Sequence, residues 1–314
     1  MSALGLPARD RKLYRILYKR LYLPRGMVHG MMSGLRGRRL GGELKRRHDL
    51  AAQLGPSDLE LDRDSAWRMV DSGESPDLSR LADLCRDHFD HFMSSGKGEA
   101  VRARNPQKQF LLGVLSGNEF LEHPELVRLM VARPIVDAAA RYLGAIPRLE
   151  GAVLWWTPPN DSRTSSQQWH IDELAQRQVK ILLNCSEVTA ESGPLHFVGA
   201  DRSDQLRARM GHRRGRVDEQ RLMSQLDETE IMAATGPPGS AVMLDSSRCL
   251  HYGSRGNRRD RLVLAFHFFA PPSPVDSRYH IELGEFGSEF ADLDPVQRLA
   301  LGHEPQAGRF AELD

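Results

Sequence analysis

The chain has 314 residues, of which 40% are hydrophobic and 27% are charged, and this composition is typical of a globular protein with a hydrophobic core. Its three cysteines are too few and too scattered for a disulfide framework or a zinc cluster, so we expect a reducing, cytoplasmic compartment. No run of about 18 apolar residues occurs, and the N-terminus lacks the apolar core of a secretory signal. We therefore predict neither a membrane-spanning helix nor a signal peptide.

The N-terminal part of the chain differs sharply in charge from the rest. Residues 1–50 contain thirteen Lys or Arg and three Asp or Glu, a net charge of +10, which leaves −9 for the remainder of a chain whose total is +1. Apolar residues at helical spacing among basic ones predict a basic helix over 8–23, and the Gly- and Arg-rich run at 34–42 predicts a loop. This arm can contact an anionic membrane surface through residues 9–47 or pack on the protein body. Basic runs alone are poor indicators of nucleic-acid binding, so no nucleic-acid partner is expected.

The remaining sequence changes from a helical to a strand-like period. Further helices are predicted at 44–54, 76–93 and 124–143, the last with an interruption near Pro134. From about residue 147, short apolar runs alternate with Gly, Pro, Asn and Asp clusters, which is typical of β-strands. The predicted strands are 150–157, 168–172, 178–184, 194–198, 240–244 and 261–269.

This division predicts an α+β fold. We expect a basic helical arm at residues 1–50 followed by a single domain at 51–314. Within that domain we expect a helical lead-in at 51–146, a β core at about 147–272 and a tail at 273–314.

The pattern with the clearest chemical meaning is the pair His170 and Asp172. Side chains two residues apart on a β-strand point to the same face, so an imidazole and a carboxylate can reach one point. His251, in a later turn-flanked segment, would complete a site of two histidines and one carboxylate that leaves part of a metal ion open. This donor set is typical of non-haem Fe(II) oxygenases. We predict structural roles for the other strand histidines, His196 and His267.

Arg261 begins a long apolar run, so we expect its guanidinium to be buried. A buried, unpaired guanidinium is costly, and Arg binds a carboxylate through two parallel hydrogen bonds. The natural anion near an Fe(II) site is the distal carboxylate of 2-oxoglutarate, and Arg259 is the alternative residue for this role. Lys180 and Asn184 share one face of their predicted strand. Either one donates a hydrogen bond to 2-oxoglutarate in this interpretation, unless that face points outward.

The order of these motifs resembles a known family. The motifs are Gln168-Trp169-His170-Ile171-Asp172, then Ser192-Gly193-Pro194-Leu195-His196-Phe197, and then His251 and Arg261. Over residues 110–272 the chain resembles the phytanoyl-CoA dioxygenase (PhyH) family. The resemblance implies a double-stranded β-helix (a jelly-roll, cupin-like barrel) with flanking helices. It also implies Fe(II) on His170, Asp172 and His251, 2-oxoglutarate on Arg261, and O₂ as the oxidant.

The chain departs from the family pattern in two places. Gly199-Ala200-Asp201-Arg202 stands where the family usually has Pro-Gly-Ser-His, and Tyr252 separates His251 from Gly253-Ser254. Asp172 bears on the reaction, because related halogenases carry Ala or Gly there and bind chloride in its place. A carboxylate therefore favours hydroxylation.

The sequence thus predicts a 2-oxoglutarate-dependent hydroxylase that acts on a small molecule and releases succinate and CO₂. Two other functions stay open at this point. One is a cupin-like metal enzyme that does not use 2-oxoglutarate, and the other is a non-catalytic binding barrel anchored by the basic arm. No motif selects a particular substrate.

Overall fold

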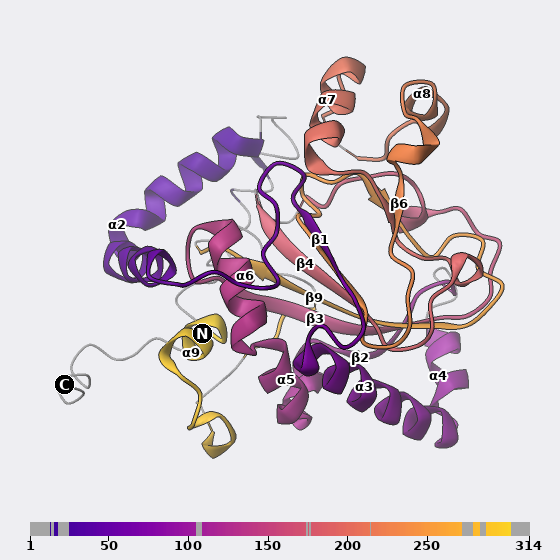
Figure 1. Ribbon diagram of the computed structural model, residues 1–314, viewed down its shortest axis with the longest axis horizontal. Coiled ribbons are helices and arrows are strands. Elements are labelled where there is room, and N and C mark those ends of the chain that lie inside the picture. Colours follow the sequence, from indigo (N-terminus) through magenta and orange to yellow (C-terminus); the bar gives the residue numbers. More distant parts are fainter. Residues whose placement is uncertain are drawn as a thin grey trace.

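The computed structural model describes residues 13, 16, 17, 25–104, 109–173, 175, 177–213, 215–271, 279–282 and 287–302. Within them the chain forms helices and two antiparallel β-sheets (Figure 1). The α-helices are α2 (Arg25–Ala52), α3 (Pro76–Ser94), α4 (Lys97–Arg104), α5 (Pro124–Met130), α6 (Arg133–Leu143), α7 (Ala200–Met210), α8 (Glu219–Met223) and α9 (Pro295–Ala300). Short 3₁₀ turns are η2 (Gly117–Glu122), η3 (Ser165–Gln167), η4 (Ala190–Ser192), η5 (Glu228–Glu230) and η6 (Ser288–Phe290).

The helices of the lead-in begin and end at residues suited to those positions. Ser75 caps α3 by accepting a hydrogen bond from the backbone N–H of Leu78, and Pro76 occupies the first turn, where no N–H is needed. Gly144 ends α6 in the left-handed conformation, with φ of 78°. The predicted helices at 76–93 and 124–143 are confirmed, and the interruption near Pro134 is the break between α5 and α6.

The larger sheet has the strand order β1-β7-β4-β9-β3-β2, with every neighbouring pair antiparallel. Its strands are β1 (Trp67–Val70), β2 (Leu112–Ser116), β3 (Arg148–Thr157), β4 (Gln178–Asn184), β7 (Ala241–Leu244) and β9 (Arg261–Phe269). The predicted strands for β3, β4, β7 and β9 are confirmed. The two edge strands were not predicted, because they are only four and five residues long and lie in the helical half of the sequence.

The smaller sheet has the order β6-β5-β8 and consists of two-residue strands. These are β5 (His196–Phe197), β6 (Met232–Ala233) and β8 (His251–Tyr252). The predicted strand at 168–172 is reduced to one antiparallel bridge between His170 and His251. It is short because the backbone N–H of Asp172 donates to the carbonyl of Ser246 in the loop after β7, so the chain leaves the small sheet there.

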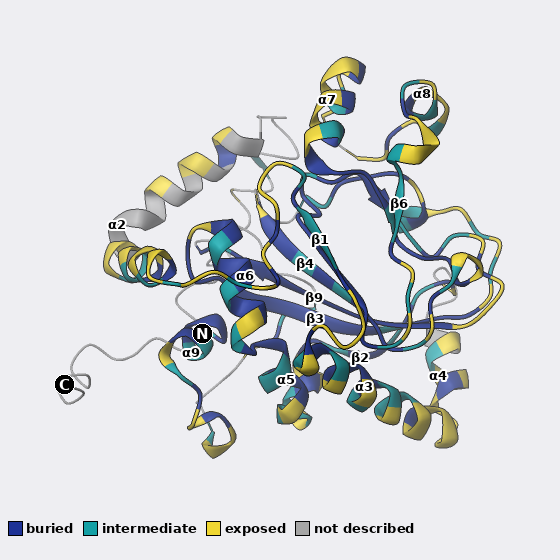
Figure 2. Cartoon of the chain, viewed as in Figure 1, coloured by how far each residue is buried: buried dark blue, intermediate teal, exposed yellow. Residues whose placement is uncertain are grey.

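The two faces of the large sheet have different environments. On one face, Ile181 of β4, Phe266 of β9 and Trp156 of β3 join the main hydrophobic core, under α3, α5 and α6 (Figure 1). Strands β3 and β9 are buried along almost their whole length, whereas α3 and α7 expose their outer sides (Figure 2). By strand alternation the opposite face carries Lys180, Asn184 and the odd-numbered residues of β9 from Arg261 to His267. This inner face is therefore the polar one.

A second hydrophobic cluster lies on the outer side of the small sheet. Trp169 and Ile171 pack there with residues of α7, α8 and the intervening loop, including Leu206, Val217 and Leu222. His170 and Asp172 alternate with these residues and so point the other way, toward the large sheet. The arrangement sets the predicted ligands between the two sheets.

The prediction of a loop at residues 34–42 is wrong, because α2 continues through them. Glycines weaken a helix, but tertiary contacts compensate at its C-terminal end. Arg47 is fully buried and donates hydrogen bonds to the carbonyl oxygens of Ile146 (2.9 Å) and Leu299 (3.0 Å). The predicted domain boundary at residue 50 therefore falls inside a helix whose end packs on the body of the protein.

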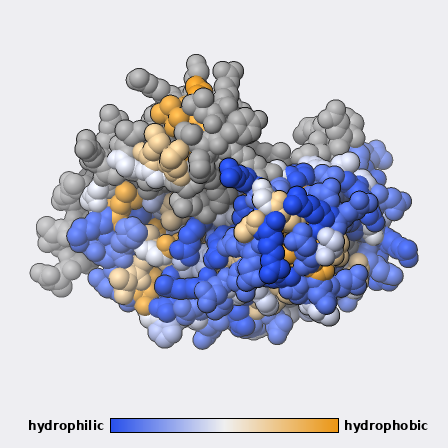
Figure 3. Space-filling view, turned by 90° about the horizontal axis from the view of Figure 1, so that it is seen from above, coloured by the Kyte–Doolittle hydropathy of each residue, from blue (hydrophilic) through white to orange (hydrophobic). Residues whose placement is uncertain are grey.

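The predicted basic helix at 8–23 lies almost wholly outside the described residues. Among the described helices, none is both long and apolar enough to cross a bilayer. Seen from above, the described surface is mainly hydrophilic with scattered apolar patches (Figure 3).

Candidate metal centre

His170, Asp172 and His251 converge between the two sheets. One ligand atom from each residue lies within 4.8 Å of the others. The Nε2 atoms of His170 and His251 lie 3.8 and 3.9 Å from the same oxygen, Oδ1 of Asp172. Both histidines are buried. The structure thus brings together the three residues that the sequence singled out.

The backbone sets the spacing of these side chains. His170 and His251 form a reciprocal pair in which each backbone N–H donates to the other residue's carbonyl, at 3.0 and 2.9 Å. Their rings lie 4.4 Å apart between centroids. Asp172 is held by its own N–H, which donates to the carbonyl of Ser246 at 2.8 Å.

Both histidines have the tautomer that metal binding requires. The Nδ1 of His170 lies 2.8 Å from the carbonyl of Gln168, and the Nδ1 of His251 lies 2.9 Å from the carbonyl of Cys249. A carbonyl only accepts hydrogen bonds, so each Nδ1 carries the proton and each Nε2 presents its lone pair to the centre. Burial lowers the pKa of His170 to about 3 and also lowers that of His251. Both imidazoles are therefore neutral at pH 7.

Asp172 presents one oxygen to the histidines and binds the protein through the other. Its Oδ2 accepts hydrogen bonds from the Lys180 ammonium and, at 2.8 Å, from the Ser246 hydroxyl. The amide of Gln178 lies 3.5 Å from the same oxygen. Burial acts to raise the pKa of Asp172, but the charge of Lys180 and its hydrogen bond to the carboxylate hold it below its usual range. The carboxylate is thus ionised and oriented as a ligand with one free oxygen.

The donor set fits a divalent transition metal. Ligand atoms bonded to one ion at about 2.1 Å and at right angles stand about 3 Å apart. The two distances to Oδ1 exceed this by less than about 1 Å, which small rotations of the side chains can close. Two neutral imidazoles and one carboxylate on one side of an ion suit Fe(II) and leave its other positions to small molecules. Among the described residues, no other group of histidines, cysteines and carboxylates meets the same distance criterion.

Arg261 is buried and has no anionic partner among the described residues. Its guanidinium donates to the carbonyl of Gly193 (2.6 Å) and to the hydroxyl of Ser254 (2.5 Å), whereas its Nε–H has no acceptor. Burial lowers its pKa to about 10. Gly193 has φ of +64°, and an added Cβ would lie 2.9 Å from the Cβ of Asn257, so only glycine fits here.

A second unpaired polar atom lies beside this guanidinium. Thr157 of β3 is directly opposite Arg261 of β9, and its hydroxyl oxygen is buried without a partner. Two unmet donors on neighbouring strands form a site that a carboxylate can satisfy. Thr157 was not predicted as a site residue, because only the register of β3 against β9 places it beside Arg261.

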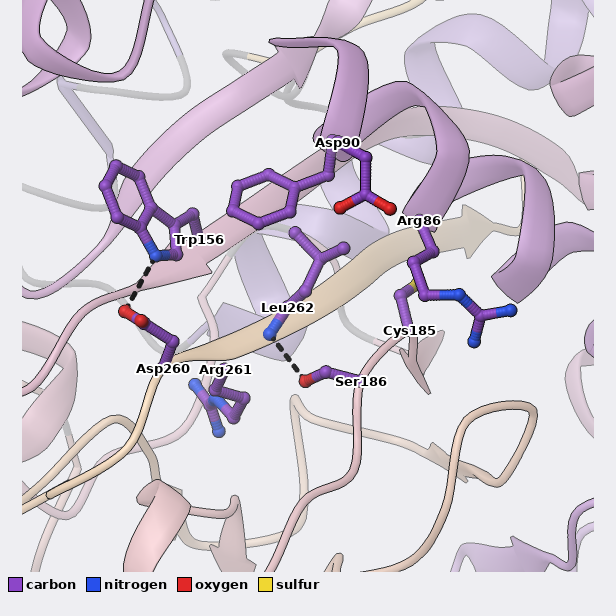
Figure 4. A pocket seen from close by; sticks show the side chains of 9 residues that line it. Arg86, Asp90, Trp156, Cys185, Ser186, Asp260, Arg261 and Leu262 are labelled. Carbon is purple, nitrogen blue, oxygen red and sulfur yellow. Dashed lines mark hydrogen bonds between the residues drawn. The ribbon is translucent and has the colours of Figure 1, made fainter. Parts of the chain in front are cut away.

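Figure 4 shows that the Arg261 side chain points to the opposite side of β9 from Leu262. Leu262 faces a cavity of about 180 Å³ beneath α3, beside Phe89 and Trp156. That cavity belongs to the helix-covered face of the sheet and includes none of the three candidate ligands. The guanidinium therefore faces the inner side, as the candidate ligands do.

The other predicted site residues have partners within the protein. Lys180 pairs with Asp172, and the Asn184 amide donates to the hydroxyl of Ser240 at 3.0 Å. Arg259 is exposed and lies 3.5 Å from a carboxylate oxygen of Glu191. Of the two arginines, Arg261 is the one with unused hydrogen-bonding capacity inside the protein.

The two histidines predicted to be structural lie in different settings. His196 stacks on Tyr252 at 4.8 Å between ring centroids, and its Nδ1 lies 3.2 Å from the carbonyl of Pro194. His267 is opposite Lys180 on the inner face and has a buried Nε2 without a partner. Burial lowers the pKa of His267 to about 3, so its ring is neutral.

Comparisons with known proteins give low similarities. No family model matches the chain, and no curated protein matches it. EctD from S. alaskensis, in a structure with 2-oxoglutarate and 5-hydroxyectoine, is 18% identical, with coverage of 71% of this chain and 85% of that chain and a TM-score of 0.49. AviO1 from Streptomyces viridochromogenes Tue57 is 13% identical, with coverage of 68% and 94% and a TM-score of 0.47.

A third solved structure is SnoK, a non-heme alpha ketoglutarate dependent carbocyclase from nogalamycin biosynthesis. It is 16% identical, with coverage of 69% of this chain and 85% of that chain and a TM-score of 0.39. Similarities of this size assign neither a family nor an activity to the chain.

Proposed function

We propose that the chain is an Fe(II)- and 2-oxoglutarate-dependent dioxygenase of the PhyH type, with a double-stranded β-helix core, that hydroxylates a small molecule. The observation that carries the proposal is the convergence of two neutral imidazoles and one ionised carboxylate from His170, His251 and Asp172. The buried guanidinium of Arg261, which has no anionic partner in the part of the chain that the structure describes, supports 2-oxoglutarate as the cosubstrate.

When bound, iron with 2-oxoglutarate and O₂ supplies an oxidative decarboxylation that yields succinate and CO₂ and hydroxylates a C–H bond of the substrate. His170 and His251 hold the ion through Nε2, with their rings oriented by carbonyl groups. Lys180 and Ser246 hold the outer oxygen of Asp172, so that its inner oxygen stays directed at the ion.

Arg261 and Thr157 receive the distal carboxylate of 2-oxoglutarate in this proposal. The guanidinium offers its unpaired Nε–H, and the threonine offers its hydroxyl. Apolar side chains of the inner face, such as Val263 and Ala265, lie along β9 between Arg261 and His267 and help to exclude water. The carboxylate at 172 favours hydroxylation over halogenation.

The test measures Fe(II) binding and succinate formation from 2-oxoglutarate with the purified full-length protein. We expect His170→Ala and His251→Ala to abolish both. His196→Ala is a matched control for the metal ligands, because His196 has the same contact between Nδ1 and a carbonyl two residues earlier but is not one of the three converging residues. The proposal fails if either ligand variant keeps near wild-type succinate formation, or if the wild-type protein binds no Fe(II).

A further inference from the structure

A short segment of the α7–α8 loop runs beside the residues that carry the candidate ligands. The backbone N–H of Val217 donates to the carbonyl of Trp169 at 2.8 Å, and the backbone N–H of Gly215 donates to the Glu173 carboxylate at 3.1 Å. These two bonds hold the segment 215–217 beside the segment 169–173, and the two segments run antiparallel.

This pairing sets the direction of Arg216. Val217 packs in the second hydrophobic cluster with Trp169 and Ile171, on the side away from the metal site. Arg216 is exposed and is not part of this cluster, so its side chain lies on a different side of the segment from Val217.

The electrostatic interactions of Arg216 agree with this placement. Partial burial lowers the pKa of Arg216, and the carboxylates of Asp172 and Glu173 act to raise it. Its charge in turn contributes to the lowered pKa values of His170 and His251. The guanidinium therefore lies within electrostatic range of all three candidate ligands.

Arg216 has no hydrogen bond or ion pair with any residue that the structure describes, and it is exposed to solvent. Two other cations near the site have anionic partners. Lys180 pairs with Asp172, and Arg255 pairs with Glu219 at 2.5 Å. Asp172 is already paired with Lys180, and Arg216 forms no ion pair with Glu173, so its guanidinium donors have no acceptor among the described residues.

We propose that Arg216 binds a carboxylate or phosphate group of the substrate and holds that group beside the metal site. The inference rests on the proposed function, because it places the substrate next to the candidate ligands. A guanidinium matches both anions through paired N–H donors, which a neutral substrate would leave unused. An anionic small molecule is therefore the substrate class that this site selects.

The experiment compares acids with their neutral amides. Dissociation constants of phenylacetate, phenyl phosphate and phenylacetamide are measured by ligand-observed NMR on the full-length protein with Zn(II) and 2-oxoglutarate. The proteins are wild type, Arg216→Gln, Arg216→Lys and Arg213→Gln. Arg213 is an exposed arginine of the same loop and serves as the matched control. Calorimetry measures 2-oxoglutarate binding to the same four proteins.

We expect the wild type to bind phenylacetate about tenfold or more tightly than phenylacetamide. Arg216→Gln should lose this preference, Arg216→Lys should keep part of it, and Arg213→Gln should match the wild type. The inference is overturned if no anionic probe binds, if acid and amide bind equally to the wild type, or if Arg216→Gln retains the preference. It is also overturned if Arg216→Gln weakens the binding of 2-oxoglutarate instead, since the arginine would then bind the cosubstrate. Failure of 2-oxoglutarate to bind the wild type would reject the proposed function separately, while the acid and amide comparison would still decide the role of Arg216.

Discussion

Replacement of Arg261 by methionine separates a binding role from a structural one. Burial lowers its pKa from 12.5 to about 10, so burial disfavours the charged form by about 3 kcal/mol. Its hydrogen bonds to Gly193 and Ser254 return about 1.5–3 kcal/mol each. Together the two bonds return about 3–6 kcal/mol, which exceeds the cost of burial by at most about 3 kcal/mol, and methionine fills a similar volume. We therefore expect Arg261→Met to change the free energy of unfolding by no more than about 3 kcal/mol.

The same substitution should have a much larger effect on 2-oxoglutarate. Loss of the charge-assisted contact from the guanidinium costs about 2–4 kcal/mol, which corresponds to a 30- to 1000-fold rise in the dissociation constant. Urea denaturation measures stability, and calorimetry with Mn(II) measures cosubstrate binding. Arg261→Lys keeps the positive charge but loses the planar guanidinium. Its dissociation constant for 2-oxoglutarate should lie between those of the wild type and Arg261→Met. If the affinity for 2-oxoglutarate is unchanged, or if the free energy of unfolding falls by well over about 3 kcal/mol, the role of Arg261 is to stabilise the fold and the reasoning is refuted.

Four further predictions follow from other parts of the structure. Thr157→Val should raise the dissociation constant of 2-oxoglutarate by up to about tenfold in calorimetry, because it removes one neutral hydroxyl donor; Thr157→Ser keeps the hydroxyl and should not change it. His267 has a folded pKa of about 3, so the stability that it contributes is complete above pH 6.5 and declines as the pH falls; His267→Phe should reduce the slope of stability against pH between 6 and 4 by about 1.4 kcal/mol per unit in urea titrations. Arg47→Met should lower the free energy of unfolding by about 3–5 kcal/mol, whereas Lys45→Met, at an exposed ion pair, should change it little. We also propose that the basic arm contacts anionic membranes through residues 9–47: full-length protein should sediment with phosphatidylserine vesicles, a variant lacking residues 1–24 should sediment less because it loses six of the arm's thirteen basic residues, and equal sedimentation of both would reject the idea.

The sequence was most informative where function depends on local spacing. His170 and Asp172 are two residues apart, so strand alternation alone puts them on one face. The apolar run after Arg261 indicated that its guanidinium would be buried, and the structure shows this. Arg261 is the first residue of β9 and is buried, whereas Arg259 lies before the strand and is exposed, a contrast that the sequence does not show directly.

Thr157 and Arg216 were not predicted from the sequence, because strand register and the course of a loop place them near the other candidate site residues. Thr157 faces Arg261 through the pairing of β3 with β9, and 104 positions separate the two residues. Arg216 reaches the site because Val217 pairs with Trp169. Neither pairing has a local signature. The helix through residues 34–42 was missed for a related reason, since contacts of Arg47 with distant carbonyl groups outweigh the local glycine content.

The reciprocal pairing of His170 with His251 has a consequence for how an ion would enter and leave. Main-chain bonds, rather than the ion, determine how far apart the two imidazoles stand. Metal binding would then not be needed to fold this part of the chain. Zinc fingers differ, because they unfold when the metal is removed. A chelator should remove iron from this protein reversibly and leave its circular dichroism spectrum unaltered.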